Sequence, residues 1–155
     1  MQIHIIAVGH RMPEWVKEAY SEYTKRMPGS CRLRLHQIPA RKRTKGTDIK
    51  RLLSDEGARI LAAVPDGCRI IALERSGQPI DTDQLVARLQ SWLHEGQDIA
   101  LLIGGPEGLA ESCLADAHEQ WSLSRLTLAH PLVRVLLAEQ FYRAWSIIDR
   151  RPYHR

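Results

Sequence analysis

Short runs of apolar or alternating residues recur along the chain, separated by segments in which apolar residues return every three or four positions. Four runs have the length of single strands: 2–8, 32–38, 69–73 and 99–103. The segments between them predict amphipathic helices over 13–27, about 48–64 and about 82–96. Strands that alternate with helices predict an α/β fold in which a mainly parallel sheet has helices on both faces. With no linker or repeat, residues 1–155 are expected to form one domain.

The strand at 99–103 runs directly into the sequence GGPEG at 104–108. In an open α/β sheet, ligands bind beyond the carboxyl ends of the strands, and Gly104 and Gly105 would let a ligand approach the main chain. A tight strand-to-helix turn without a ligand is the commoner explanation of such glycines. The spacing matches neither the dinucleotide fingerprint nor a phosphate loop. A second loop at a strand's carboxyl end is predicted over 74–77.

Three further elements are predicted near the carboxyl terminus: a short helix over 110–120, a β-prone segment over 122–128, and a long helix from Pro131 to about Ile148. The apolar residues of this helix surround much of its circumference: Leu132, Val133, Val135, Leu136, Leu137, Phe141, Trp145 and Ile148. They cannot all face one sheet, so the helix should be buried on two sides. A second subunit could cover one of them.

Positive charge is concentrated in the amino-terminal part of the chain. The chain has 22 basic and 18 acidic side chains, and 13 of the basic ones lie in the first 60 residues. Arg41, Lys42, Arg43 and Lys45 fall within five residues of a predicted loop, where they could bind the phosphates of a nucleic acid. A solvated basic loop is the alternative, and these residues alone do not decide between the two.

The remaining composition argues against several kinds of site. Cys31, Cys68 and Cys113 lie far apart, and the seven histidines are scattered, so we predict no metal site and no disulfide framework. The apolar run at 3–8 is too short for a signal peptide or a membrane span. These features favour a protein of the reducing cytoplasm that is not bound to a membrane.

Several long motifs carry a specific resemblance. They are IGGPEGL at 103–109, SLSRLTLAHPLVRVLLAEQFYRAWSI at 122–147, PYHR at 152–155, VGHRMPEWVKEAYSEYTKRMP at 8–28, and IPARKR with DIKRLL between 38 and 53. In these motifs the chain resembles the RlmH family, small SPOUT-class methyltransferases that use S-adenosylmethionine on large-subunit ribosomal RNA. The resemblance covers nearly the whole chain. It favours a ligand loop at 104–108 and RNA contact by the basic loop.

The fold, assembly and cofactor contacts of the family are implied by this resemblance alone. It implies a SPOUT-type fold with a carboxyl-terminal trefoil knot, and homodimers that pack through the last helix. The S-adenosylmethionine contacts would be Leu73, Gly104, Leu123, Ser124, Arg125, Leu126, Thr127 and Leu128. Because the methyl donor is already activated, such a site needs to position its reactants more than it needs acids, bases or nucleophiles.

The acceptor that the family implies is N3 of a pseudouridine in large-subunit (23S) ribosomal RNA, within the ribosome. The terminal residues Tyr153, His154 and Arg155 are the catalytic candidates, because they combine a stacking ring, a titratable imidazole and a cation. A frayed basic tail is the alternative. The base that removes the N3 proton is left open among His154, His130 and Glu107. We also expect the tail of one subunit to complete the partner's site.

Two other functions compete with this interpretation. A non-catalytic RNA-binding or ribosome-associated factor would use the basic loop and the tail equally well, but it has no need of the glycine loop at 104–108. An enzyme acting on another nucleotide is disfavoured, because the chain lacks a phosphate-loop pattern.

Overall fold

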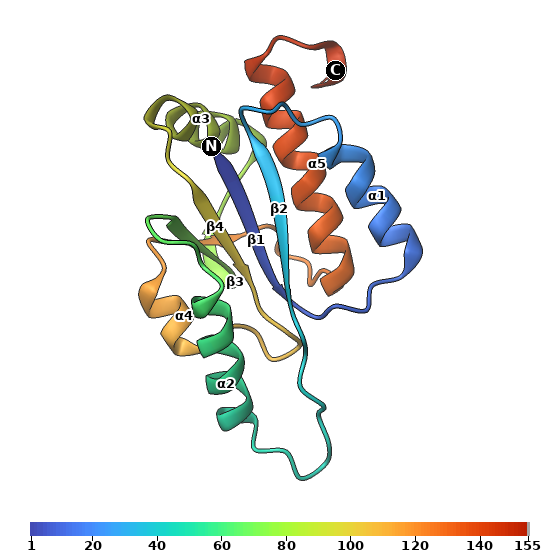
Figure 1. Ribbon diagram of the computed structural model, residues 1–155, viewed down its shortest axis with the longest axis vertical. Helices are drawn as coiled ribbons and strands as arrows, with labels where there is room; N and C mark the ends of the chain where they lie inside the picture. Colours follow the sequence, from blue (N-terminus) through green and yellow to red (C-terminus); the bar gives the residue numbers. More distant parts are fainter. Residues whose placement is uncertain (155) are drawn as a thin grey trace.

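A computed structural model describes residues 1–154, with side chains through Tyr153 (Figure 1). The strands are β1 (Gln2–Val8), β2 (Arg32–Ile38), β3 (Arg69–Pro79), β4 (Ile99–Ile103) and β5 (Glu119–Ser122). The helices are α1 (Glu14–Thr24), α2 (Ile49–Ala62), α3 (Thr82–Glu95), α4 (Glu111–Asp116) and α5 (His130–Ile148), followed by the 3₁₀ turn η1 (Pro152–His154). Arg155 lies outside the described residues.

The five strands form one sheet in the order β2-β1-β4-β3-β5, and all neighbouring strands are parallel. Each strand is joined to the next by a helix, as parallel pairing requires. The predicted α/β class is therefore confirmed. The shared direction also brings the carboxyl ends of all five strands to one edge, where ligands bind in such sheets.

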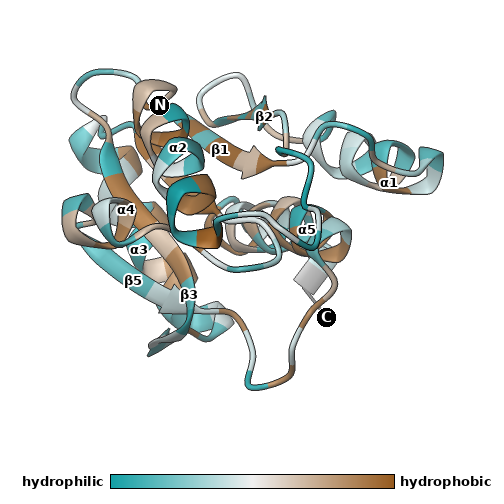
Figure 2. Cartoon of the chain, turned by 90° about the horizontal axis from the view of Figure 1, so that it is seen from below, coloured by the Kyte–Doolittle hydropathy of each residue, from teal (hydrophilic) through white to brown (hydrophobic). Residues whose placement is uncertain are grey.

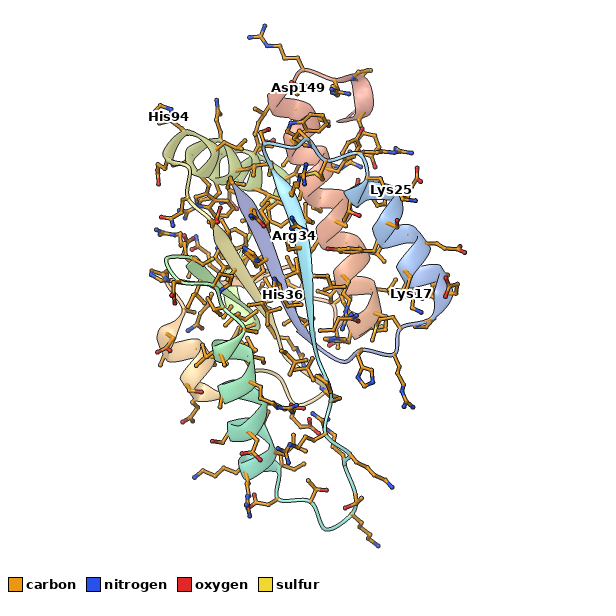
Figure 3. All side chains as sticks on the ribbon, viewed as in Figure 1. Lys17, Lys25, Arg34, His36, His94 and Asp149 are labelled. Atoms are coloured by element: carbon orange, nitrogen blue, oxygen red, sulfur yellow. The ribbon has the colours of Figure 1, made fainter. Side chains whose placement is uncertain are left out.

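The side chains of β1 point alternately into two hydrophobic cores. Ile3 and Ile5 point into a core shared with α3 and α5, whereas Ile6 and Val8 point into a core shared with α2 and α4. The first core also receives Tyr20 from α1, which packs beside α5. Figure 2 shows much of β1 as hydrophobic, whereas the edge strand β5 and the outer sides of the helices are hydrophilic. Lys17 and Lys25, on the outside of α1, illustrate this pattern (Figure 3).

The predicted helix boundaries rest on recognisable caps. The Asp48 side chain accepts a hydrogen bond from Arg51 N at 3.2 Å at the start of α2. Asp81 and Gln84 form a capping box at the start of α3, and Gly96 ends that helix with φ of 67°. Among residues 1–154, no helix is both long and apolar enough to span a bilayer.

Three local predictions were wrong. The loop predicted at 74–77 belongs to β3, which continues to Pro79 through a register shift between Leu73 and Gln78. Pairing with β5 overrides the turn-forming residues here. A Cβ atom at Gly77 would lie 2.7 Å from the carbonyl carbon of Trp121, so only glycine lets the two strands approach this closely.

The β-prone segment predicted over 122–128 is irregular beyond Ser122, and the helix predicted over 110–120 ends at Asp116. Side-chain hydrogen bonds turn the chain here, because Ser122 Oγ donates to Ser124 O at 3.1 Å and Ser124 Oγ accepts from Leu126 N at 2.9 Å. Such local bonds compete with strand pairing. The trefoil knot implied for this region stays a prediction.

Helix α5 has apolar residues around most of its circumference because α1, α3 and the sheet pack against it within one chain. This accounts for much of the apolar pattern from which a second subunit was expected. Leu126 and Leu132, near the start of the helix, stay 77% and 44% exposed. These two leucines leave an apolar surface beside the carboxyl edge of the sheet.

Candidate functional site

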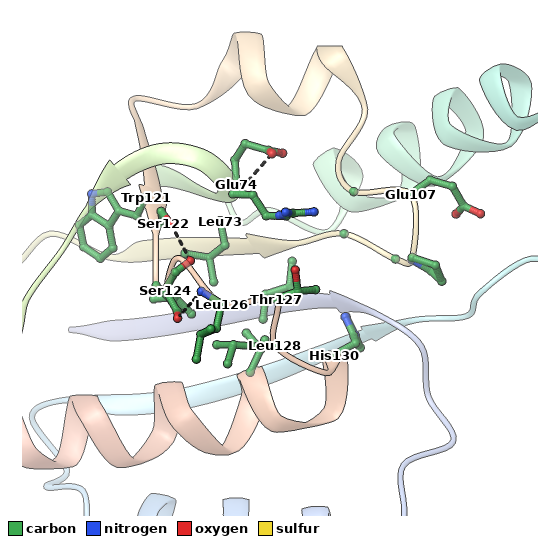
Figure 4. A pocket seen from close by; sticks show the side chains of 18 residues that line it. Leu73, Glu74, Glu107, Trp121, Ser122, Ser124, Leu126, Thr127, Leu128 and His130 are labelled. Carbon is green, nitrogen blue, oxygen red and sulfur yellow. Dashed lines mark hydrogen bonds between the residues drawn. The ribbon is translucent and has the colours of Figure 1, made fainter.

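A cavity of about 630 Å³ opens beyond the carboxyl end of β4, beside the middle of β3 (Figure 4). Its walls are residues 73–75, the glycine loop 103–108, the segment 121–128 without Arg125, and the first turn of α5. The fold thus brings together seven of the eight predicted cofactor residues: Leu73, Gly104, Leu123, Ser124, Leu126, Thr127 and Leu128. Arg125 is exposed and does not line the cavity.

The glycine loop doubles back on itself at the cavity wall. Gly108 N donates to Gly105 O at 3.0 Å, and Gly108 has a φ of +83°, which favours glycine. A Cβ atom at Gly104 would lie 2.3 Å from Gly108 O and 2.7 Å from Leu109 N. Glycine at 104 is therefore required by the loop's own backbone, whether or not a ligand approaches it.

Two carboxylates lie along the cavity wall. Glu74 Oε1 accepts a hydrogen bond from Arg75 N at 2.9 Å. Glu107 Oε2 accepts one from Arg43 Nε at 2.6 Å, and Figure 4 shows its side chain pointing away from Leu73 and Ser124. Glu74 follows Leu73 in β3, and Figure 4 shows its carboxylate pointing away from Ser124, Leu126 and Leu128.

His130 is the titratable imidazole of the cavity wall. Burial lowers the pKa of His130 below its ordinary value of 6.5, and the nearby Arg134 cation lowers it further. The carbonyls of Val8 and Gly104 act in the opposite direction but do not outweigh burial. The imidazole is therefore neutral near pH 7, the state in which it can accept a proton.

Arg134, which the sequence analysis missed, anchors α5 beneath this site. Its side chain is 1% exposed, and it donates to Gly9 O at 2.6 Å, Val8 O at 3.3 Å and Gln37 Oε1 at 2.8 Å. These bonds tie the first turns of α5 to the carboxyl ends of β1 and β2, and thereby position His130. An arginine within the apolar run LVRVLL was the available signal.

Comparison with known proteins decides the family. A model described as "Predicted SPOUT methyltransferase" matches residues 1–154. The chain belongs to the SPOUT methyltransferase family. It is 55% identical over 155 residues to ribosomal RNA large subunit methyltransferase H of Thioalkalivibrio sulfidiphilus, covering 100% of this chain and 99% of the relative. It is 52% identical to the protein of the same name from Methylococcus capsulatus, covering 100% of both.

These relatives confirm the resemblance to the RlmH group of SPOUT methyltransferases. A solved methylase family protein from Neisseria gonorrhoeae superimposes with a TM-score of 0.52 at 14% identity, covering 91% of this chain and 80% of that one. At this identity the superposition shows a shared fold alone. The parallel sheet with its cavity at the carboxyl edge is therefore the SPOUT methyltransferase fold.

Tyr153, in the carboxyl-terminal tail of this SPOUT methyltransferase, does not line the cavity of its own chain. The cavity adjoins the first turn of α5, whereas η1 follows the last turn of this 19-residue helix and packs back along it. Tyr153 Oη donates to Glu139 Oε1 at 3.1 Å, and its ring packs edge-on against Tyr142 with centroids 4.7 Å apart. The side chain of His154 and all of Arg155 lie outside the described residues.

The four cations of the basic loop differ in their surroundings. Arg41, Lys42 and Lys45 are exposed, although Arg41 lies 3.8 Å from Asp55. Arg43 points inward and its side chain is only 21% exposed. Within residues 1–154, no group of three or more histidine, cysteine, aspartate or glutamate side chains is placed to hold a metal ion.

Proposed function

We propose that the chain transfers the methyl group of S-adenosylmethionine to N3 of a pseudouridine in large-subunit (23S) ribosomal RNA. The observation that carries this proposal is the cavity at the carboxyl edge, lined by seven of the eight residues that the family resemblance implies. Relatives that share 52–55% of its residues over the whole chain are named ribosomal RNA large subunit methyltransferase H. The cavity's volume of about 630 Å³ suits a ligand of this size.

The residues present fit such a cofactor. Main-chain groups of the glycine loop and of segment 121–128 would hold the adenine, and Leu73 and Leu128 would enclose it. Glu74 offers a carboxylate among the residues that line the cavity, suited to the cofactor's positively charged groups or to its ribose hydroxyls. The cofactor supplies a methyl group on a sulfonium, and the chain supplies position and a dry, low-dielectric wall.

The N3 proton of the acceptor has to leave, and two of the three candidate bases differ clearly in the structure. Glu107 already accepts a short hydrogen bond from Arg43. His130 is neutral near pH 7 because burial lowers its pKa. Of these two, His130 is therefore the better proton acceptor, and His154 is the alternative on the tail.

We infer that the tail serves this chemistry from another subunit, because Tyr153 packs against Glu139 and Tyr142 of its own α5 and does not line its own cavity. We therefore propose a homodimer in which Tyr153, His154 and Arg155 of one chain complete the partner's site. Deleting these three residues should leave S-adenosylmethionine affinity intact and abolish methyl transfer. A mixed dimer of a tail-deleted chain with a cavity-defective chain should regain up to half of the activity, because one site keeps both intact parts.

A second hybrid provides the control, pairing a wild-type chain with a chain that carries both defects. Activity present in this hybrid but absent from the mixed dimer would place the tail in its own subunit's site, contrary to the composite model. Activity absent from both hybrids would mean that turnover requires both sites of the dimer to be intact.

Large-subunit RNA would meet the exposed cations Arg41, Lys42 and Lys45 through its phosphates. Neutralising one of them should reduce the slope of log affinity against log salt by roughly 0.7 to 0.9 for each phosphate that the protein no longer neutralises. An unchanged slope would show that these residues form a solvated loop and do not neutralise phosphates.

Calorimetry with S-adenosylmethionine, ATP and NAD tests the cofactor assignment. We expect binding of S-adenosylmethionine and none of the other two. If the protein bound ribosomal RNA but not S-adenosylmethionine, the non-catalytic RNA-binding function would replace the proposed one.

A further inference from the structure

Glu56 is a carboxylate on the buried face of an amphipathic helix. Leu52, Glu56 and Ile60 follow each other at four-residue spacing along α2, and they are 5%, 2% and 1% exposed. Helical residues at this spacing share one face, and here that face packs on the sheet. An ionised carboxylate in such a position is costly unless a positive group accompanies it.

Arg43 supplies that positive group. Its NH2 atom donates to Glu56 Oε1 at 3.1 Å and to Oε2 at 3.3 Å, its Nε donates to Glu107 Oε2 at 2.6 Å, and its NH1 donates to Arg41 O at 3.1 Å. All three guanidinium nitrogens are thus hydrogen-bonded within the protein. A guanidinium engaged in this way has little left to offer a phosphate.

The three partners of Arg43 come from separate parts of the fold. Glu56 belongs to α2, Glu107 to the glycine loop at the cavity wall, and Arg41 to the basic loop. The guanidinium also lies directly against the glycine loop, since a Cβ atom at Gly105 would be 2.9 Å from Arg43 NH2. A side chain at position 105 would have to displace the Arg43 guanidinium.

We propose that Arg43 is a positioning residue, fixed by the buried Glu56, that holds the glycine loop in the shape that binds the cofactor. It is then distinct from Arg41, Lys42 and Lys45, which point into solvent and would meet RNA. This inference rests on the proposed function, because it assigns Arg43 to the cofactor cavity. It also replaces the prediction, made from the sequence, that all four cations act alike.

The test compares three variants by calorimetry with S-adenosylmethionine and by the salt dependence of ribosomal RNA binding. Glu107→Gln weakens the link to the glycine loop, because it removes the charge of the acceptor that Arg43 Nε reaches. Arg43→Gln combined with Glu56→Gln removes the ion pair of Arg43 with Glu56, called the clamp below, without leaving a buried unpaired charge. Lys42→Gln is the matched control, because it neutralises the adjacent exposed cation.

We expect the first two variants to weaken S-adenosylmethionine binding roughly tenfold or more, the effect of losing a charge-assisted hydrogen bond. Their RNA salt slope should equal that of the wild type. Lys42→Gln should show the reverse, with a smaller slope and unchanged cofactor affinity. Cofactor affinity unchanged in the double variant, or a salt slope reduced as in Lys42→Gln, would overturn the assignment.

Hydrogen exchange of the Gly108 amide separates this inference from the proposed function, because it needs no cofactor. That amide donates to Gly105 O within the loop that Arg43 contacts. The double variant should exchange it faster than wild type, whereas Lys42→Gln should not. If the wild type fails to bind S-adenosylmethionine while the exchange result holds, the cofactor assignment is wrong and the clamp stands. Unchanged exchange in the double variant contradicts the clamp itself.

Discussion

Replacing Gly104 with alanine adds one methyl group at the tightest point of the glycine loop. The new Cβ atom would lie 2.3 Å from Gly108 O, whereas ordinary contacts begin near 3.4 Å. The loop would therefore have to open by about 1.1 Å between these atoms. Opening it strains the hydrogen bond from Gly108 N to Gly105 O and moves the cavity wall.

Forcing one methyl group into a packed site typically costs about 1–3 kcal/mol. A domain of this size is usually stable by about 5–15 kcal/mol, so Gly104→Ala should remain folded. The displacement of about 1.1 Å at the cavity wall should weaken S-adenosylmethionine binding by more than tenfold. The expected result is therefore a modest loss of stability together with a large loss of affinity.

Denaturant unfolding measures the loss of stability, and calorimetry with S-adenosylmethionine measures the loss of affinity. Gly46→Ala is the matched control, because no atom lies within 4 Å of a Cβ at that position. Wild-type affinity in Gly104→Ala would refute the loop assignment. Loss of affinity in Gly46→Ala as well would show that the assay reports general damage.

Two further predictions follow from buried titratable groups. Burial lowers the pKa of His4 below 6.5, and His36 on the neighbouring strand lowers it further, with its Nε2 atom 2.9 Å from His4 Nδ1 (Figure 3 labels His36). The unfolded state therefore binds the proton more tightly than the folded state does. The free energy of unfolding should fall as the pH drops below 6.5. The variant His4→Gln should flatten this dependence; stability that rises on acidification would contradict it. Burial raises the pKa of all three free thiols, so they should react with a thiol reagent only slowly before denaturation, and fast labelling of the native protein would contradict the burial of Cys31, Cys68 and Cys113.

The strand and helix order could be predicted from the sequence because each element carries its own periodicity and caps. The strand predicted at 99–103 was confirmed, and the Asp81 cap of α3 is a signal of the same local kind. The extension of β3 to Pro79 was not predictable in this way, since it depends on pairing with β5, about 40 residues later. Long-range pairing of this kind leaves no trace in a local window.

The candidate site, too, could be predicted only in part. The glycine loop and segment 123–128 were assigned by family resemblance, and the fold brings them to one cavity. The separate role of Arg43 was hidden, because its distinction from Lys42 comes from Glu56 on another element. That Tyr153 packs on Glu139 and does not line its own cavity was equally hidden, since it follows from how the chain turns back after α5.

Transfer of a labelled methyl group is the most direct test of the central claim. The protein would be incubated with methyl-labelled S-adenosylmethionine and ribosomes from cells that lack the gene, and the RNA digested and examined by mass spectrometry. We predict one labelled nucleoside, a pseudouridine methylated at N3, in large-subunit RNA. Label on another base, on the ribose or on small-subunit RNA, or no label although S-adenosylmethionine binds, would contradict the account.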